Sequence, residues 1–162
     1  MIEIVAAHTP RHLPSVVALF REYEASLDFS LCFQDFEREV AELPGRYAPP
    51  PGRLLLGFVQ GRALGCVAMR KLDAAACEMK RLYVRPEARG TGLGRRLAEQ
   101  IVIEARECGY GTMRLDTVST MRAAIALYRS LGFRETEPYC DNPIAGVLYF
   151  ELALRRAHGD PL

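Results

Sequence analysis

The stretch LYVRPEARGTGLGRRLAEQ, residues 82–100, decides how the whole chain is interpreted. An apolar run ends at a proline, and an amphipathic pattern with helical spacing begins shortly after it. The loop between them carries alternate glycines among basic residues: Gly90, Gly92 and Gly94, with Arg89, Arg95 and Arg96. Glycine frees the backbone from Cβ clashes, and a helix N-terminus favours an anion. The pattern predicts a strand, a phosphate-binding turn and a helix.

Length and composition describe an ordinary globular protein. The chain has 162 residues, of which 49% are hydrophobic and 25% charged, and this length suits a single domain. We expect that domain over 1–155, followed by a short tail over 156–162. The net charge of +1 argues against nucleic acid or an anionic membrane as a partner. No apolar run is long enough to span a bilayer, and no signal peptide is apparent.

The cysteines indicate a reducing compartment. There are five, scattered along the chain, with no C-x-x-C pair. We therefore expect free thiols in the cytoplasm, mostly as small core residues, rather than a disulfide framework or a metal site.

Apolar periodicity predicts an α/β domain with a mixed sheet and flanking helices. Strands are expected at 1–7, 54–59, 62–72, 76–84, 112–118 and 147–154. Helices are expected from Thr9 and Pro10 to about 27, over 33–43, over 93–108, and over 119–132 with Gly132 as the C-terminal cap. The Pro/Gly-rich segment 44–53 is expected to be a loop.

The glycine loop can be compared with common phosphate-binding motifs. It lacks the GxxxxGK[ST] of a P-loop, and Arg95 stands where a GxGxxG fingerprint needs its third glycine. The pattern that fits is R-x-x-G-x-G, at Arg89, Gly92 and Gly94. Together with the preceding strand and the downstream AAIALYRSLGF, it resembles the GNAT superfamily of acetyl-CoA-dependent N-acetyltransferases, in their bacterial type. The resemblance covers most of the chain and implies a GNAT-like acyl-CoA N-acyltransferase fold.

The resemblance also implies where acetyl-CoA binds. The strand before the loop would hold the pantetheine arm through Leu82, Tyr83 and Val84. The loop would hold the pyrophosphate through the backbone and side chains of Arg89, Gly90, Thr91, Gly92, Leu93, Gly94 and Arg95. Many members carry an asparagine seven residues before a tyrosine that corresponds to Tyr128, and this chain departs from them with Met121. For the arginines, the alternative is a solvated helix surface with an Arg95–Glu99 pair.

Two catalytic residues follow from the same resemblance. Tyr128 corresponds to the tyrosine that protonates the departing thiolate, and Glu78 to a carboxylate that accepts the proton of the amine. Strand N–H groups could stabilise the oxyanion. The alternatives are that Tyr128 is only a core residue on an apolar stripe, and that Glu78 is only part of a surface cross-strand pair.

The acceptor is less well defined by the sequence. The segments expected around it contain Phe33, Tyr47 and Tyr139, while Lys80 and Arg81 could pair with an acidic group on it or be solvated strand charges. We expect a primary amine on a small-molecule or amino-acid-like acceptor, attacking the thioester directly in a ternary complex. A protein N-terminus or lysine as acceptor, a non-catalytic CoA-binding module, and a nucleic-acid-binding domain are the competing interpretations. No metal is expected, and a homodimer is left open.

Overall fold

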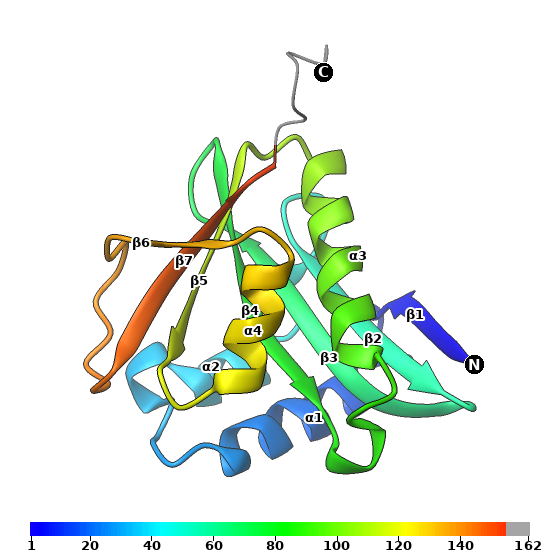
Figure 1. Ribbon diagram of the computed structural model, residues 1–162. Coiled ribbons are helices and arrows are strands. Elements are labelled where there is room, and N and C mark those ends of the chain that lie inside the picture. Colours follow the sequence, from blue (N-terminus) through cyan, green and yellow to red (C-terminus); the bar gives the residue numbers. More distant parts are fainter. Residues whose placement is uncertain (155–162) are drawn as a thin grey trace.

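A single seven-stranded mixed sheet forms the centre of the computed structural model, which describes residues 1–154 except for the side chain of Phe33. The spatial order of the strands is β1-β2-β3-β4-β5-β7-β6 (Figure 1). All neighbouring strands are antiparallel except β4 and β5, which run parallel. The strand bounds are β1 Ile2–Ala6, β2 Arg53–Val59, β3 Arg62–Lys71, β4 Ala76–Val84, β5 Thr112–Val118, β6 Arg134–Thr136 and β7 Val147–Ala153.

Helices cover both faces of this sheet and create two cores. On one face α3 and α4 pack against the sheet, and on the other face α1 and α2 do so (Figure 1). The consecutive Leu54, Leu55 and Leu56 of β2 alternate between the two cores, as residues of a strand buried on both faces must. The helical segments are α1 Leu13–Ser26, η1 Cys32–Gln34, α2 Phe36–Ala41, η2 Gly45–Tyr47, η3 Pro86–Ala88, α3 Leu93–Glu107 and α4 Arg122–Ser130.

The parallel strands β4 and β5 pair over only a short distance. Their last paired residues are Glu78 and Arg114, although the strands continue to Val84 and Val118. On its other edge β4 stays paired with β3 as far as Val84. Beyond Glu78 the two strands therefore diverge, and within residues 1–154 no strand pairs with the edge of β4 that faces β5 (Figure 1).

Most predicted elements are confirmed, and the differences lie at their ends. The helix predicted over 33–43 is two pieces, because Asp35 between η1 and α2 has a left-handed backbone with φ +57°. The segment predicted as a loop over 44–53 contains the short helix η2. The helix predicted from Thr9 begins at Leu13, because Thr9 accepts backbone hydrogen bonds in a preceding turn.

The last helix begins later than predicted and ends as predicted. Met121 occupies the N-cap position, so α4 starts at Arg122 rather than at Ser119 or Thr120. Gly132 follows the helix with φ +100°, and the N–H of Phe133 donates back to the carbonyl of Tyr128. That geometry is a glycine C-terminal cap. The predicted tail over 156–162 lies outside the described residues.

Candidate active site

The glycine loop connects β4 to α3, and its glycines are needed for different reasons. Gly90 and Gly92 have φ values of +85° and +90°, which residues with a Cβ rarely adopt. Gly94 lies in the first turn of α3, where an added Cβ would contact Val84 at 3.5 Å. The N–H of Leu93 donates to the Thr91 hydroxyl, and that of Arg96 donates to the carbonyl of Gly92. The N–H groups of Gly94 and Arg95 are therefore the ones of this first turn that remain for an anion.

The side chains around the loop are divided between the surface and the core. Arg89 donates to the carbonyl of Val84, and Arg95 donates to the hydroxyl of Ser130 and pairs with Glu99 at 3.8 Å. The Arg95–Glu99 pair considered as an alternative in the sequence therefore does form. Leu93 is fully buried, so only its backbone is free to meet a ligand.

Two sheet glycines that sequence analysis did not single out hold the start of α3 close to the sheet. A Cβ on Gly57 would lie 2.5 Å from Leu93, and one on Gly65 would lie 2.9 Å from Leu97. These contacts leave no space for a side chain. The start of α3, which follows the loop, is therefore held close to β2 and β3.

A small cavity of about 50 Å³ lies where β4 and β5 diverge. It reaches from the α1 side of the sheet to the α4 side, because both helices contribute to its walls. Its lining residues are Tyr23, Phe29, Leu31, Gln34, Met79, Lys80, Arg81, Leu82, Leu115, Asp116, Thr117, Met121 and Tyr128. The cavity brings Leu82, Lys80, Arg81 and Tyr128 of the predicted site together. Tyr83 instead turns its side chain into the core beside α1.

Tyr128 reaches this cavity from α4. Its ring is buried against Phe133, at 5.8 Å between ring centroids. Burial raises the pKa of its hydroxyl, which keeps that hydroxyl protonated at neutral pH. Met121 lines the same cavity and accepts a hydrogen bond at its sulfur from Thr117. Tyr128 is thus both a core residue and part of a cavity wall.

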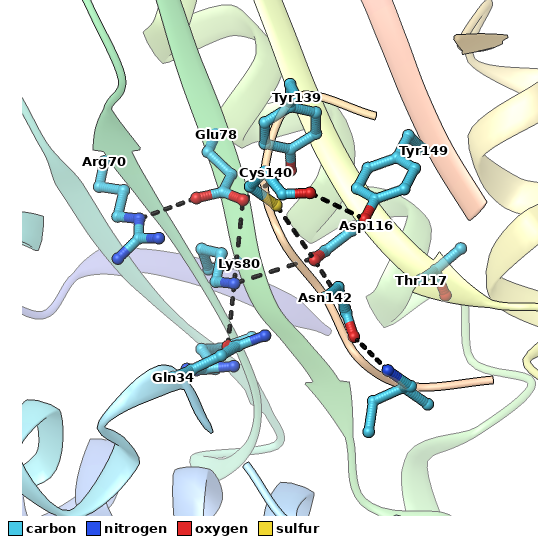
Figure 2. A network of polar contacts seen from close by, with 12 residues as sticks. Gln34, Arg70, Glu78, Lys80, Asp116, Thr117, Tyr139, Cys140, Asn142 and Tyr149 are labelled. Carbon is cyan, nitrogen blue, oxygen red and sulfur yellow. Dashed lines mark hydrogen bonds and ion pairs between the residues drawn. The ribbon is translucent and has the colours of Figure 1, made fainter. Parts of the chain in front are cut away.

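Glu78 lies at the last paired position of β4 and is only 1% exposed (Figure 2). It accepts hydrogen bonds from Arg70 Nε at 2.8 Å and from the Tyr139 hydroxyl at 2.6 Å. Arg70 is its cross-strand partner on β3. The cross-strand pair considered in the sequence analysis therefore exists, but it is buried rather than on the surface. Arg70 supplies the positive charge that a buried carboxylate needs.

Asp116 on β5 is a site residue that sequence analysis missed. Lys80 Nζ lies 3.9 Å from Asp116 Oδ1 and 3.9 Å from Glu78 Oε2, and it donates to Gln34 Oε1 at 3.0 Å (Figure 2). Asn142 donates to the other oxygen of Asp116 at 3.0 Å. The available signal was a single acidic residue within the strand 112–118, between Leu115 and Thr117.

Lys80 is therefore a buried ammonium group between two carboxylates. Its side chain is shielded from water, and its pKa is lowered chiefly by desolvation. Glu78 and Asp116 raise this pKa, while Arg81 and Arg70 lower it further. Glu78, Asp116 and Cys140 also bring three ligand-type atoms within 4.8 Å of one another. Lys80 and Arg70 together balance the charge of the two carboxylates, so we assign no metal to this cluster.

Arg81 follows Lys80 directly and still lies on the same face of the sheet. Val67 of β3 faces both Arg81 and Leu82, and Arg81 has a left-handed backbone with φ +61°, so β4 has a bulge here. The guanidinium donates two 2.9 Å hydrogen bonds to Glu39 and lies over the ring of Phe36. Its donors face a protein carboxylate rather than the open cavity.

A second, larger cavity of about 520 Å³ lies beside the first and shares Gln34 with it. Its lining residues are Gln34, Asp35, Arg38, Glu39, Glu42, Pro44, Gly45, Arg46, Tyr47 and Arg70. Tyr47 is buried against Phe20, and among the described residues its hydroxyl has no hydrogen-bond partner. Of the other residues predicted around the acceptor, Tyr139 contacts Glu78, and the side chain of Phe33 lies outside the described part.

Two of the five cysteines, Cys66 and Cys77, are buried as expected of core residues. Cys32 and Cys140 are exposed, which differs from the prediction, and Cys108 is intermediate. All five thiols are free. Within residues 1–154, no helix has both the length and the apolar character that crossing a membrane requires.

Comparisons with known proteins agree with this geometry. Residues 15–133 match the Acetyltransferase (GNAT) family. The chain is 41% identical to an uncharacterized N-acetyltransferase of Schizosaccharomyces pombe over 157 residues, which cover 96% of each chain. A shorter match, 42% over 52 residues, covers 32% of this chain and 30% of the L-amino acid N-acyltransferase MnaT of Escherichia coli. The structure of yncA from Salmonella typhimurium with its cofactor acetyl-CoA has a TM-score of 0.72 at 21% identity, over 96% of this chain and 95% of that one.

A glycine loop at a helix N-terminus, beside two parallel strands that diverge, defines an acyl-CoA-dependent N-acetyltransferase. The chain belongs to the GNAT family of acetyltransferases. Its fold is the GNAT fold, as expected from the sequence. The expected bacterial type is too narrow, because the fission-yeast relative matches over almost its whole length.

Proposed function

We propose that the protein transfers an acetyl group from acetyl-CoA to a primary amine on a small-molecule or amino-acid-like acceptor. The observation that carries this proposal is the position of the small cavity. It lies directly beyond the Glu78–Arg114 pair, with Tyr128 on one side of the sheet and the Lys80–Asp116 cluster on the other. A thioester there would have the Tyr128 hydroxyl on one side and the carboxylate of Asp116 on the other.

The pyrophosphate of acetyl-CoA would bind the first-turn N–H groups of α3, with Arg89 and Arg95 adding positive charge. The pantetheine arm would lie along the unpaired edge of β4, at Leu82, Tyr83 and Val84. The positive φ of Gly90 and Gly92 supports this assignment, because that backbone conformation turns the loop without a side chain in the path of the phosphates.

The chemistry would be a direct attack in a ternary complex. An alkyl ammonium group titrates near 10.4, so the acceptor must lose a proton before it attacks. Glu78 would accept that proton, directly or through water, and strand N–H groups would stabilise the oxyanion. Tyr128 would then protonate the leaving thiolate. Burial raises the pKa of the Tyr128 hydroxyl, so the hydroxyl holds its proton at neutral pH, but the same shift makes it a weaker acid toward the thiolate.

The charge of the site and the size of its cavities support a small amine as the acceptor. Asp116 lines the small cavity and could accept a hydrogen bond from the ammonium group of the acceptor, and the second cavity could hold the rest of a small acceptor next to Gln34 and Arg70. The likeness to an L-amino acid N-acyltransferase agrees with an amino-acid-like acceptor. We also place the protein in the cytoplasm, because its five cysteines are free.

Two other functions remain in competition: acetylation of a protein N-terminus or lysine, and CoA binding without catalysis. Met121, which stands where many relatives have asparagine, is the feature that favours the second. The deciding experiment measures CoA release from acetyl-CoA with a panel of free amino acids, polyamines and peptides. Release with a small amine supports the proposal, release with peptides alone favours the protein acceptor, and binding without release favours the non-catalytic module.

A further inference from the structure

The chain uses lysine very sparingly. Of its 21 lysines and arginines, only Lys71 and Lys80 are lysines. Lys71 is exposed at the end of β3, whereas Lys80 is 6% exposed in the candidate site. Arginine stays protonated in proteins, but a lysine that loses its proton becomes a primary amine nucleophile. Lys80 is thus a buried amine of the chemical type that the proposed reaction acetylates.

The amine of Lys80 lies beside the small cavity. Lys80 and two neighbours of its Nζ atom, Gln34 and Asp116, all line the cavity of about 50 Å³. Tyr128 lines the same cavity. A space of that volume has room for several water molecules, since one water needs about 10–15 Å³ of such space. An acyl group placed there would lie beside Lys80, Gln34 and Asp116, which line the cavity.

We propose that Lys80 is a self-acetylation site, modified by bound acetyl-CoA when no acceptor amine is present. The inference rests on the proposed function, because it requires the thioester to lie where β4 and β5 diverge. It goes beyond that function in assigning a modified residue and a consequence for activity.

The step balances with groups already in the site. The Lys80 ammonium group gives one proton to Asp116 Oδ1, which lies 3.9 Å away, and becomes a neutral amine. The Nζ lone pair then forms a C–N bond with the thioester carbonyl carbon. The C–S bond breaks, and its electron pair leaves on sulfur. The second proton lost by nitrogen balances the one that Tyr128 gives to the thiolate, so the products are an amide, free CoA and one proton.

Burial supports this reactivity. Desolvation lowers the pKa of Lys80, which increases the neutral fraction compared with an exposed lysine.

Acetylation of Lys80 changes the charge of the site. An acetylated Lys80 carries no charge, so Glu78 loses one of its cations and Asp116 loses its nearest one. The amide would also lie in the cavity where the thioester binds, and we expect it to block further turnover.

The test incubates the full chain with acetyl-CoA and no amine, and follows acetylation of each peptide by mass spectrometry. We expect one acetyl group on Lys80, appearing at least about ten times faster than on Lys71, because the site holds amine and thioester together. The same chain unfolded in denaturant is the control, and there the two lysines should react at similar rates.

A second readout is activity after preincubation. With acetyl-CoA alone, activity toward an amine should decline in parallel with Lys80 acetylation, while preincubation with CoA should have no effect. Lys80→Arg keeps the positive charge and removes the nucleophile, so the variant should take up no acetyl group at position 80 and its activity should not decline with preincubation. Lys80→Gln serves the labelling experiment if the arginine variant does not fold.

The outcomes separate this inference from the proposed function. If amines release CoA but Lys80 reacts no faster than Lys71, self-acetylation is wrong and the proposed function stands. If acetyl-CoA neither stabilises the fold nor reacts with any amine, both are wrong. Acetylation of Lys80 at equal rates in the folded and unfolded chain would also overturn the inference, because the site would then play no part.

Discussion

The guanidinium of Arg81 and the carboxylate of Glu39 form a buried, two-point ion pair that joins the bulge of β4 to α2, with both hydrogen bonds at 2.9 Å. Arg81 is almost fully buried. Desolvation is the largest single effect on its pKa and lowers it, but the hydrogen bonds to Glu39 and the electrostatic attraction of Tyr47, Glu39 and Tyr23 together raise the pKa above its ordinary value. The pair fixes α2, and with it the wall of the second cavity, against the strand that carries Lys80.

We expect Glu39→Ala to lower the free energy of unfolding by about 3–5 kcal/mol, since it leaves a buried guanidinium without a partner. Urea unfolding at neutral pH measures this loss. Glu37→Ala is a matched control from the same helix: it breaks the exposed pair with Arg21 and should leave the midpoint close to that of the parent. Equal shifts for the two variants would contradict the role assigned to Arg81.

The sequence predicts the sheet, the glycine loop and the position of Tyr128 because each depends on local pattern. Apolar periodicity identifies strands and helices, and glycines between arginines identify an anion-binding turn. The bulge at Arg81 could not be predicted in this way, since its left-handed φ is stabilised by Glu39, 42 residues earlier in the chain. Asp116 was missed for a related reason: its importance depends on Lys80 and Asn142, which only the fold brings to it.

The glycine loop can be tested with two glycines at opposite ends of α3. Gly92 precedes the helix with φ +90°, Gly109 follows it with φ +89°, and neither has an atom within 4 Å of an added Cβ. Alanine at either position should cost roughly 1–2 kcal/mol of stability through backbone strain. Only Gly92→Ala should also weaken acetyl-CoA binding, because its Cβ lies in the proposed phosphate loop. Calorimetric titration measures the difference, and equal affinities for both variants would show that the loop does not contact the ligand.

Tyr128→Phe keeps the ring against Phe133 and removes only the hydroxyl. If Tyr128 protonates the leaving thiolate, kcat should fall by about 10²–10⁴ while acetyl-CoA affinity stays nearly constant. Tyr110→Phe is the control: it removes a buried hydroxyl that donates to the carbonyl of Pro51, away from the site. That variant should lose about 1 kcal/mol of stability and retain its kcat. An unchanged kcat in Tyr128→Phe would make Tyr128 a core residue only.

Cys140 reports on the charge of Asp116. Its thiol is exposed, yet partial burial and the carboxylate of Asp116 at 3.8 Å raise its pKa to about 11. Because the thiolate is the reactive form, alkylation by iodoacetamide at pH 8 should be slower than that of glutathione by a factor on the order of a hundred. Asp116→Asn removes the negative charge, lowers the pKa and should speed the reaction. Peptide mass spectrometry measures both rates, and a rate that Asp116→Asn leaves unchanged would mean that this carboxylate does not act on the thiol.

Glu78→Gln tests the proposed proton acceptor through the pH dependence of the reaction. The variant keeps the shape of the side chain but cannot take a proton from an ammonium group. At neutral pH the acceptor is almost entirely protonated, so the loss in kcat/KM should be large. As the pH approaches the pKa of the amine, near 10.4 for a lysine-like group, the acceptor loses its proton without help, and the deficit should shrink by about tenfold per pH unit.

Glu151→Gln is the control for a general loss of charge in the sheet. It loosens the pair with Arg114 on the neighbouring strand and should show no such trend with pH. A deficit in Glu78→Gln that stays constant with pH would instead assign Glu78, held by Arg70 and Tyr139, to the structure of the site.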